Sequence, residues 1–436
     1  MQALFTLCST VYLLIYAFEG AIRYGLYSIG KDNLILARDA LIVGPLALLL
    51  AAQAFRLRVN PAFAVFAGIV VLHGAIARFN LHTMLPAIYG AKLLVNVLFG
   101  FIAGRQLMQP SRRILLLIAL VWLVSVGGVV LDKFVYTFPW MGLETHVGGI
   151  QVDVSRGWDI DSGFDKRAAG FTRSSISAAM LLPTLALVIA PRIRNVLIRL
   201  ALLAITTVAV ALTTQKGALV GIGAVGAVLC APAWSRYWLL YMSCVTFAIL
   251  TVALPLITAG LLVSDTGGVF SFASLAMRIS LTWPDAWQWI WNNEVFPFGV
   301  GLGGIGGAQR FYAANFVNPS DNLFVFLYAN FGLMGLVYLG WIVTVGRRLP
   351  QEEQRLAITP LAMLAFNLAY GIVLSMLEDQ ISALFIGASA GMLWQLRETA
   401  RAGRWSDPYL GSFTGLAPSM FPSGATIPGR RAARAH

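Results

Sequence analysis

The chain has 436 residues, of which 58% are hydrophobic and 11% are charged. Soluble globular proteins carry about a quarter charged residues, so this composition excludes an ordinary soluble domain and indicates an integral membrane protein. The net charge of +12 comes largely from arginines between apolar runs, a distribution typical of cytoplasmic loops rather than of a nucleic-acid-binding surface. The three cysteines and four histidines show no spacing typical of a metal site or a disulfide framework.

In chain order, about twelve stretches are apolar enough and long enough to cross a bilayer core of roughly 30 Å. They are 3–22, 35–55, 61–79, 83–104, 113–131, 171–190, 196–214, 217–233, 237–262, 322–345, 356–376 and 381–396. The first lacks a basic segment and a cleavage site, so we expect a retained span rather than a cleaved signal peptide. The eighth is short and rich in glycine, and is the least regular of the predicted crossings.

The arginines between spans predict the orientation. With twelve spans, most of them fall on one side, which the positive-inside rule makes cytoplasmic together with both termini. They are Arg56, Arg58, Arg105, Arg112, Arg113, Arg192, Arg194, Arg199, Arg236, Arg347, Arg348 and Arg355, joined by Arg397, Arg401 and Arg404 near the tail.

The sequence therefore predicts an all-α polytopic membrane protein with two large outer loops that carry short helices. We divide it into an N-terminal five-helix membrane part (1–131), a first large loop (132–170), central membrane helices (171–262), a second large loop (263–320), C-terminal membrane helices (321–397) and a disordered cytoplasmic tail (398–436). The tail is rich in Pro, Gly and Ser and ends in basic residues, a composition that favours disorder near anionic lipid.

The stretch "NPSDNLFVFLYANFGLMGLVYLG" (318–340) places Asp321 and Asn322 at the outer start of the tenth span. Ser320 and Asp321 are residues that commonly cap helix N-termini. A capped helix start and a functional carboxylate are both open at this point.

Several cations lie on the outer side, where positive charge is disfavoured: Arg167, Arg173, Lys216, Arg278 and Arg310. Guanidinium and ammonium groups neutralise phosphate, so these residues predict an anion site. The alternatives are pairing with nearby acids, namely Asp161, Asp165 and Asp285, or contact with lipid headgroups.

The second loop holds two further motifs. "PDAWQWIWN" (284–292) predicts a short helix with Pro at its start, whose Trp283, Trp287 and Trp291 share one face and suit the membrane interface or stacking on sugar rings. "GLGGIG" (301–306) fits G-x-G-x-x-G by spacing, but a dinucleotide site requires a strand before it and a helix after it. We interpret it as a tight glycine turn.

Charges inside or near the spans are candidates for an ion path. Lys92 lies mid-span with Asn96 one turn on, and Arg38 with Asp39 adjoins the second span. Glu378 and Asp379 precede the last span, where we expect a solvated turn.

Together these motifs resemble the O-antigen ligase and polysaccharide polymerase superfamily (WaaL-like and Wzy-like proteins). Members carry His or Asp, then Asn, nine residues, then G-x-x-G; here the match is Asp321-Asn322 followed by Gly332 and Gly335. The order of three further motifs also agrees. They are R-x-x-G at Arg167 and Gly170; "LTTQKGA" with Lys216 in the place of the family's arginine; and Arg278, Trp287 and the glycine turn after Pro297. The resemblance covers about residues 160–345.

The resemblance implies an all-helical C-type glycosyltransferase in the bacterial inner membrane, with its active site on the periplasmic side. The donor would be a glycan on undecaprenyl pyrophosphate and the acceptor a sugar hydroxyl, without a nucleotide sugar, a metal or another cofactor. Arg278, Lys216, Arg310 and Arg167 or Arg173 would bind the pyrophosphate. Asp321 would be the general base, with Asn322 orienting it or the acceptor. Implied partners are membrane lipids, a chain-length regulator and export subunits, and no nucleic acid.

Two departures bear on the reaction. Ligases rely on a histidine where this chain has Asp321, which favours a polymerase that lengthens an exopolysaccharide or O-antigen. Lys216 keeps the charge of the family's arginine but not its bidentate fork. The alternatives are a ligase that transfers the glycan to lipid A core and, from another class, a lipid-linked glycan transporter. A transporter predicts inverted repeats and paired intramembrane charges, and the sequence has no repeat of fixed period.

Overall fold

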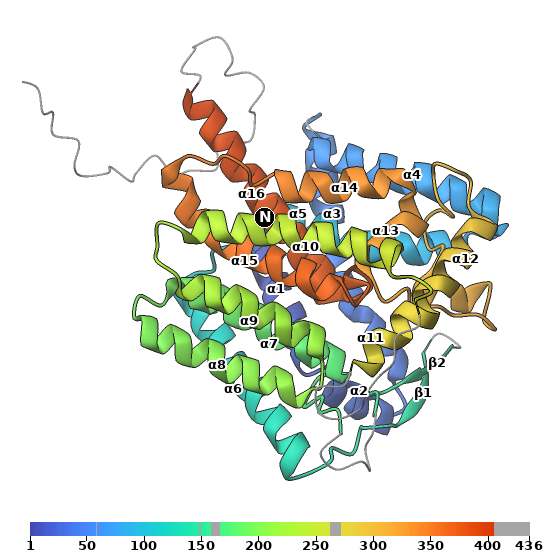
Figure 1. Cartoon of the computed structure of the whole chain (residues 1–436), viewed down its shortest axis with the longest axis horizontal. Helices are drawn as coiled ribbons and strands as arrows, with labels where there is room; N and C mark the ends of the chain where they lie inside the picture. The colour runs from blue at the N-terminus through green and yellow to red at the C-terminus, as the bar shows by residue number, and fades with distance from the viewer. Residues whose placement is uncertain (58, 148–149, 158–165, 262–271, 405–436) are drawn as a thin grey trace, which may run out of the picture.

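The computed structural model describes residues 1–57, 59–147, 150–157, 166–261 and 272–404. Within these residues the chain is almost wholly helical (Figure 1). The helices of the first half are α1 (Gln2–Ala17), α2 (Glu19–Ser28), η1 (Asp32–Leu36), α3 (Ala37–Phe55), α4 (Pro61–Leu81), α5 (Leu85–Met108), α6 (Arg112–Phe134), α7 (Ser175–Ile189), η3 (Ala190–Arg192) and α8 (Val196–Leu212).

The second half continues with α9 (Lys216–Cys230), α10 (Arg236–Ile257), α11 (Ala273–Met277), η4 (Arg278–Thr282), α12 (Trp283–Asn293), η5 (Gly306–Phe311), α13 (Leu323–Phe331), α14 (Leu333–Thr344), α15 (Gln351–Gly371), η6 (Met376–Glu378) and α16 (Gln380–Arg404). Strands β1 (Glu144–Val147) and β2 (Ile150–Asp153) form an antiparallel hairpin in which Glu144 lies opposite Asp153.

The described part of the chain is an all-α membrane protein. Six helices are long and apolar enough to cross a membrane, or seven when the bent pair α1 and α2 is counted as one span. Helices at the periphery expose large apolar side chains, such as Val71, Leu120, Val208 and Ile249, which suits contact with lipid. Each predicted span overlaps one helix or one broken pair, and the total of twelve crossings stays a prediction.

The first predicted span, 3–22, is broken into two helices, since α1 and α2 are bent by 76°, and a single crossing there stays a prediction. The α2 segment carries charge: Glu19 and Arg23 are buried and paired at 2.8 Å. Gly20 also packs against the loop before α7, where its N–H donates to the Phe171 carbonyl. A polar helix with these contacts turns away from the direction of α1.

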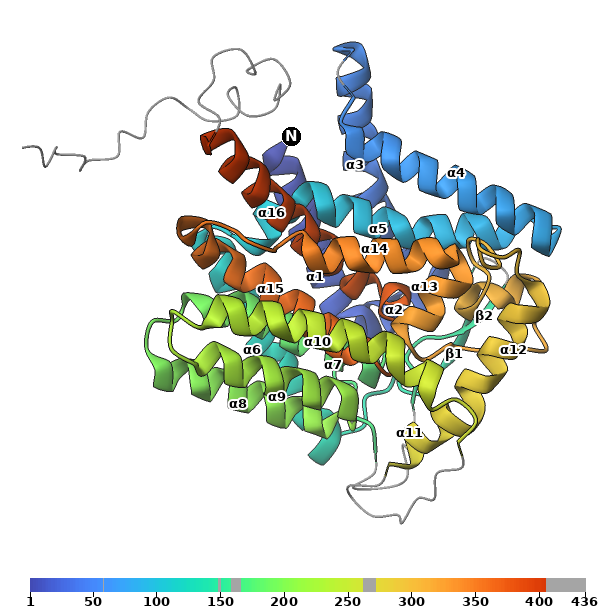
Figure 2. The ribbon, with the colours of Figure 1, turned by 45° about the horizontal axis from the view of Figure 1, so that its top comes forward.

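The two loop segments differ in structure. The described residues of the second loop form the short helices α11, η4, α12 and η5, as expected. Those of the first loop form the β1–β2 hairpin, so our expectation of short helices there is wrong. Thr145, Val147, Ile150 and Val152 are β-branched, which favours strand over helix. Both views show these loop elements gathered at one end of the molecule, with α2 beside the hairpin (Figures 1 and 2).

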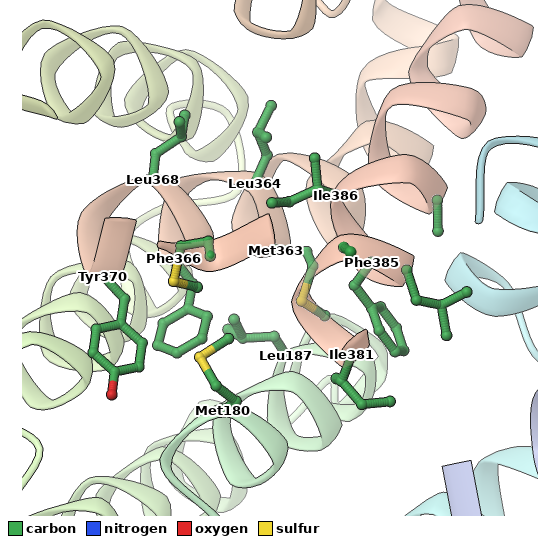
Figure 3. Close-up of a cluster of buried hydrophobic side chains, with 14 of the residues drawn as sticks. Met180, Leu187, Met363, Leu364, Phe366, Leu368, Tyr370, Ile381, Phe385 and Ile386 are labelled. Carbon is green, nitrogen blue, oxygen red and sulfur yellow. The ribbon is translucent and has the colours of Figure 1, made fainter. Parts of the chain in front are cut away.

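The core lies where α7, α15 and α16 meet. Met180 and Leu187 of α7 face side chains of α15 and α16, namely Met363, Phe366 and Phe385 (Figure 3). All five side chains are at most 2% exposed. Helices α5 and α16 pack closely through glycines: a methyl group on Gly104 or Gly387 would overlap the backbone of the partner helix. Small residues that allow such approach are the usual means of helix association in membranes. This rigid centre supports the loop elements at the end of the molecule.

Candidate functional site

The turn that carries Asp321 is fixed by hydrogen bonds to three other elements. The Asn318 side chain donates to the Thr282 carbonyl at 2.9 Å and accepts from the Ser320 N–H at 2.7 Å. The Ser320 and Ser375 hydroxyls are bonded at 2.6 Å, and the indole N–H of Trp283 donates to the Asp321 carbonyl at 3.4 Å. Ser320 and Asp321 have φ values of 56° and 39°. Such left-handed backbone is uncommon outside glycine and is often retained at functional sites.

Asn322 is the residue that caps α13, so the interpretation of Ser320 or Asp321 as the cap is wrong. The Asn322 side-chain oxygen accepts from the N–H groups of Phe324 and Val325 at 2.8 and 3.0 Å. Its amide donates to the carbonyls of Thr251 and Ile372 at 3.1 and 2.9 Å. Asn322 is fully buried, and it connects α13 to α10 and to the end of α15 directly beside Asp321.

The Asp321 carboxylate is therefore not used as a cap, and it pairs with Arg278. The Arg278 Nη2 lies 3.1 Å from the Asp321 Oδ2, and both side chains are about one-fifth exposed. Burial raises the pKa of Asp321, and the charge of Arg278 lowers it. The Nη1 of Arg278 donates to Ser274, whereas its buried Nε has no hydrogen-bond partner among the described residues. Two of the three residues assigned to catalysis through the resemblance, Arg278 and Asp321, are thus in direct contact.

Arg278 begins the π-helical turn η4. π-turns are rare and occur frequently at functional sites. The turn leads directly into α12, whose second residue is Pro284, as the sequence predicts. Both ends of this turn thereby contact Asp321: Arg278 pairs with its carboxylate, and Trp283 donates to its carbonyl.

The tryptophans of α12 have different environments. Trp283 and Trp287 are buried, and the Trp287 indole N–H donates to the Pro255 carbonyl of α10 at 3.2 Å. An interfacial role for these two is therefore wrong, because they pack within the protein. Trp291 stacks on Trp287 with ring centroids 6.0 Å apart and is 65% exposed.

The "GLGGIG" stretch is a tight turn, as predicted, with φ of 102° at Gly301 and 80° at Gly303. The Gly303 N–H donates to the Asn330 side chain at 2.6 Å, and Val300 N–H to the Ala329 carbonyl at 2.8 Å. No strand precedes the turn in the described residues 272–300, in keeping with the rejection of a dinucleotide site. The turn attaches the second loop to α13.

Glu378 and Asp379 do not form a solvated turn, so that expectation is wrong. The Glu378 carboxylate accepts from the Gly307 N–H at 2.7 Å. The Asp379 carboxylate accepts from the Tyr16 hydroxyl and from the Ser382 N–H and hydroxyl. The pKa of Glu378 is raised to about 7, chiefly by burial and also by the charge of Asp321, with the Gly307 hydrogen bond partly offsetting the rise. Glu378 is thus a second acid within electrostatic range of Asp321.

We expect Glu378 to make stability depend on pH. Because its pKa is raised from 4.5 to about 7 in the folded protein, the folded state binds the proton more tightly than the unfolded chain. The contribution of protonated Glu378 is therefore fully present below about pH 4.5 and lost as pH rises through 7. Thermal unfolding in detergent between pH 5 and 8 should show this fall in wild type and a flatter profile in Glu378→Gln. The exposed Glu352→Gln is the matched control, and an unchanged profile in Glu378→Gln would contradict the assignment.

The predicted pyrophosphate-binding cations divide into two groups. Arg173 and Arg310, together with Arg156, act electrostatically on Tyr89 along with Glu378, so they belong to one region. Burial lowers the pKa of Arg173, and its buried Nε has no hydrogen-bond partner among the described residues. Arg310 is exposed. Among charged groups, Glu19 of α2 acts most strongly on Arg173.

Lys216 and Arg167 are both exposed. Lys216 begins α9. The preceding residue, Gln215, accepts from the Tyr370 hydroxyl at 3.0 Å, and Tyr370 lies in the electrostatic field of Arg278 and Asp321. Lys216 is therefore connected to the region of the site through two residues, Gln215 and Tyr370. The acids Asp161 and Asp165, proposed as alternative partners, lie outside the described residues, as does the predicted tail beyond residue 404.

The charges near the membrane interior are paired. The Lys92 ammonium lies 2.6 Å from the Asp39 carboxylate, and Arg38 lies 2.8 Å from Glu19. Lys92 is thus not an isolated intramembrane charge. The sequence did not identify Glu378, Asp379 or Tyr370 as site residues. The acidic pair directly before the last span was the available signal, but its partners, Gly307 of η5 and Tyr16 of α1, are distant in the sequence.

No protein-family model matches the chain, and no curated protein matches it.

Proposed function

We propose that the protein is a polysaccharide polymerase of the bacterial inner membrane. It transfers glycan repeat units from undecaprenyl pyrophosphate to a sugar hydroxyl of another lipid-linked unit at the periplasmic face. The observation that carries the proposal is the Arg278–Asp321 ion pair on a left-handed turn at the start of an apolar helix. The ordered motifs that resemble the ligase and polymerase superfamily support the same assignment.

The chemistry requires a base and an anion-binding group at one place. In the transfer, the acceptor hydroxyl oxygen attacks the anomeric carbon of the donor, and its proton passes to the Asp321 carboxylate. The bond from the anomeric carbon to the phosphate oxygen breaks, and its electron pair leaves with undecaprenyl pyrophosphate. Arg278 stabilises the charge that grows on that leaving group, and Arg173 and Arg310 add positive charge nearby.

The ion pair also suggests how the donor prepares the base. Before the donor binds, burial raises the pKa of Asp321, and the positive charge of Arg278 offsets part of that rise. A pyrophosphate competes for the same guanidinium, whose Nε still lacks a partner among the described residues. When Arg278 shifts toward the pyrophosphate, the Asp321 carboxylate loses part of its compensation and becomes a stronger base. Donor binding thus activates the residue that deprotonates the acceptor.

We expect Arg278→Ala to abolish chain growth and Arg278→Lys to retain only part of it, since lysine keeps the charge but loses the fork. The measurement uses the purified protein with a defined undecaprenyl-pyrophosphate repeat unit, followed on a gel. The proposal expects a ladder of products from wild type. A wild-type-like ladder from Arg278→Ala would contradict the assigned role.

The same assay separates the polymerase from its alternatives. Transfer only to added lipid A core would make the protein a ligase. If several repeat units give no product, transport of the lipid-linked glycan into and out of proteoliposomes tests the remaining alternative. The pairing of Lys92 with Asp39 is the observation on which a transport assay would focus.

A further inference from the structure

The start of η5 connects the Asp321 turn to Glu378. The Gly306 N–H donates at 3.1 Å to the carbonyl of Asn318, the residue whose side chain fixes that turn. The next residue, Gly307, donates its N–H to the Glu378 Oε1 atom at 2.7 Å. One oxygen of the Glu378 carboxylate is therefore fixed by a backbone segment that also holds the Asp321 turn.

A second connection runs through Ser375, in the same turn as Glu378. The Glu378 N–H donates to the Ser375 carbonyl at 2.9 Å. The Ser375 hydroxyl is bonded to the hydroxyl of Ser320, the residue directly before Asp321, at 2.6 Å. With the connection through η5, these bonds close a ring. Glu378 and Asp321 are thus held at a fixed separation, across which the charge of Asp321 acts on Glu378.

Two polar atoms beside Gly307 are open to a ligand. The Glu378 Oε2 atom accepts no hydrogen bond from the described residues, and the Tyr89 hydroxyl has no hydrogen-bond partner among them either. Both side chains are half-buried, and both oxygens retain accessible surface. A methyl group on Gly307 would lie 2.9 Å from the Tyr89 oxygen and 3.5 Å from the Glu378 Oε1 atom. The two groups therefore border the same glycine, which leaves space between them.

The chemistry of these groups suits a sugar. A carboxylate oxygen only accepts hydrogen bonds, whereas a phenol both donates and accepts. Sugar hydroxyls can donate to Glu378 and exchange hydrogen bonds with Tyr89. The Tyr89 ring packs against Phe311 with centroids 5.7 Å apart, and such rings offer apolar area to the face of a sugar. A phosphate would instead be repelled by the Glu378 carboxylate.

The position relative to Asp321 distinguishes the acceptor from the donor. In the proposed reaction, Arg278 of η4 holds the pyrophosphate of the donor, and the attacking hydroxyl lies at the Asp321 carboxylate. Glu378 comes from η6, directly before α16, and carries a charge that disfavours the pyrophosphate. Because Glu378 and Asp321 lie within electrostatic range of each other, neighbouring parts of one oligosaccharide can contact both.

We propose that Glu378 and Tyr89 bind the acceptor sugar and present one of its hydroxyls to Asp321. The Glu378 Oε2 atom accepts from a second hydroxyl of the acceptor, and Tyr89 adds its hydroxyl and ring. The inference rests on the proposed polymerase function for the identity of the sugar, which is the repeat unit of the polysaccharide. The fixed separation of Glu378 from Asp321 then selects which hydroxyl of the acceptor reacts.

The test measures sugar binding without turnover. A fluorescently labelled single repeat unit, freed from its pyrophosphate by mild acid so that it cannot act as a donor, is titrated onto the full-length protein in phosphatidylcholine nanodiscs. We expect Glu378→Gln to weaken binding about tenfold and Tyr89→Phe about fivefold, the effects of losing a charged and a neutral hydrogen bond. Gln keeps an acceptor for the Gly307 N–H, and Phe keeps the packing on Phe311.

Two control variants make the same chemical changes elsewhere on the protein. Glu352→Gln lies at the exposed start of α15, and Tyr27→Phe lies on α2, where Tyr27 is 42% exposed. Neither residue belongs to the proposed sites, so both variants should bind the repeat unit like wild type. A loss of binding in the controls equal to that in Glu378→Gln and Tyr89→Phe would overturn the assignment.

Transfer kinetics distinguish sugar binding from a purely structural role. With saturating lipid-linked donor and the lipid-free repeat unit as the varied acceptor, Glu378→Gln should raise the KM for the acceptor about tenfold with little change in kcat. Asp321→Asn should instead lower kcat. A fall in kcat without a change in the acceptor KM of Glu378→Gln would overturn the binding role.

Three binding results would also overturn the inference. They are no binding of the repeat unit by wild type, binding that Glu378→Gln and Tyr89→Phe both leave unchanged, and displacement of the sugar by inorganic pyrophosphate that requires Arg310, whose charge also acts on Glu378. Failure of the proposed function gives a different result. Wild type then forms no product ladder from the lipid-linked donor, whereas Glu378-dependent binding of the sugar remains.

Discussion

Replacing Asp321 by Asn should lower the rate of glycan transfer by about 10²–10⁴-fold, the usual contribution of a general base. Asn has the same shape but cannot take the acceptor proton. It also tolerates left-handed backbone better than most residues, so the φ of 39° at this position need not change. Ala lacks that tolerance, so an alanine variant would confuse lost chemistry with backbone strain. The measurement is the initial rate of product formation with a saturating lipid-linked donor.

The matched control is Asp285→Asn, on the first turn of α12. Asp285 is exposed and has no part in the proposed reaction, so its variant should keep the wild-type rate. If Asp321→Asn also kept the wild-type rate, Asp321 would not be the base. The neighbouring acid Glu378 would then be the first residue to replace.

Gly332→Ala should strongly destabilise the protein. Gly332 separates α13 from α14 and has φ of 58° and ψ of −140°, a conformation that costs other residues about 1–3 kcal/mol. A methyl group there would also overlap the backbone of Pro297 and lie 2.6 Å from the Gly299 nitrogen. Since Leu333 N–H donates to the Pro297 carbonyl at 2.8 Å, relief of the overlap would detach the glycine turn from α13.

Gly340→Ala provides the comparison within the same helix pair. A methyl group at Gly340 meets no atom within 4 Å, and alanine favours helix over glycine by about 1 kcal/mol. We therefore expect Gly340→Ala to unfold at or slightly above the wild-type temperature, and Gly332→Ala to unfold well below it or to fail to accumulate. Thermal unfolding of the two purified proteins in detergent checks this. Equal unfolding temperatures would show that the break between α13 and α14 does not need glycine.

Much of the helical architecture could be predicted because hydropathy is a local property of the chain. The apolar stretches 61–79, 83–104 and 113–131 correspond to α4, α5 and α6 to within a few residues. The sequence did not indicate the bend between α1 and α2, where tertiary contacts act on a weak local signal. The stretch 3–22 is apolar enough to span, yet Glu19 and Arg23 pair within the protein and the helix bends.

The residues of the candidate site were predicted only in part, because motifs are local in the sequence whereas contacts between distant segments are not. Sequence motifs identified Asp321 and Arg278, and the structure joins them at 3.1 Å. The motifs also identified Asn322, but the sequence did not indicate that its side chain would cap α13 and bond to Thr251 and Ile372. Glu378 was missed because nothing local distinguishes a solvated acid from one that accepts from Gly307.

By itself, the sequence determined that this is a helical membrane protein and which cations and acids are candidates for its chemistry. The density of apolar residues decides the first, and the residue types and their order decide the second. Only the tertiary structure decided that Arg278 meets Asp321 and that Glu378 accepts a hydrogen bond from Gly307. The physical reason is that a contact between distant segments depends on how the helices between them pack, which no single stretch of sequence encodes.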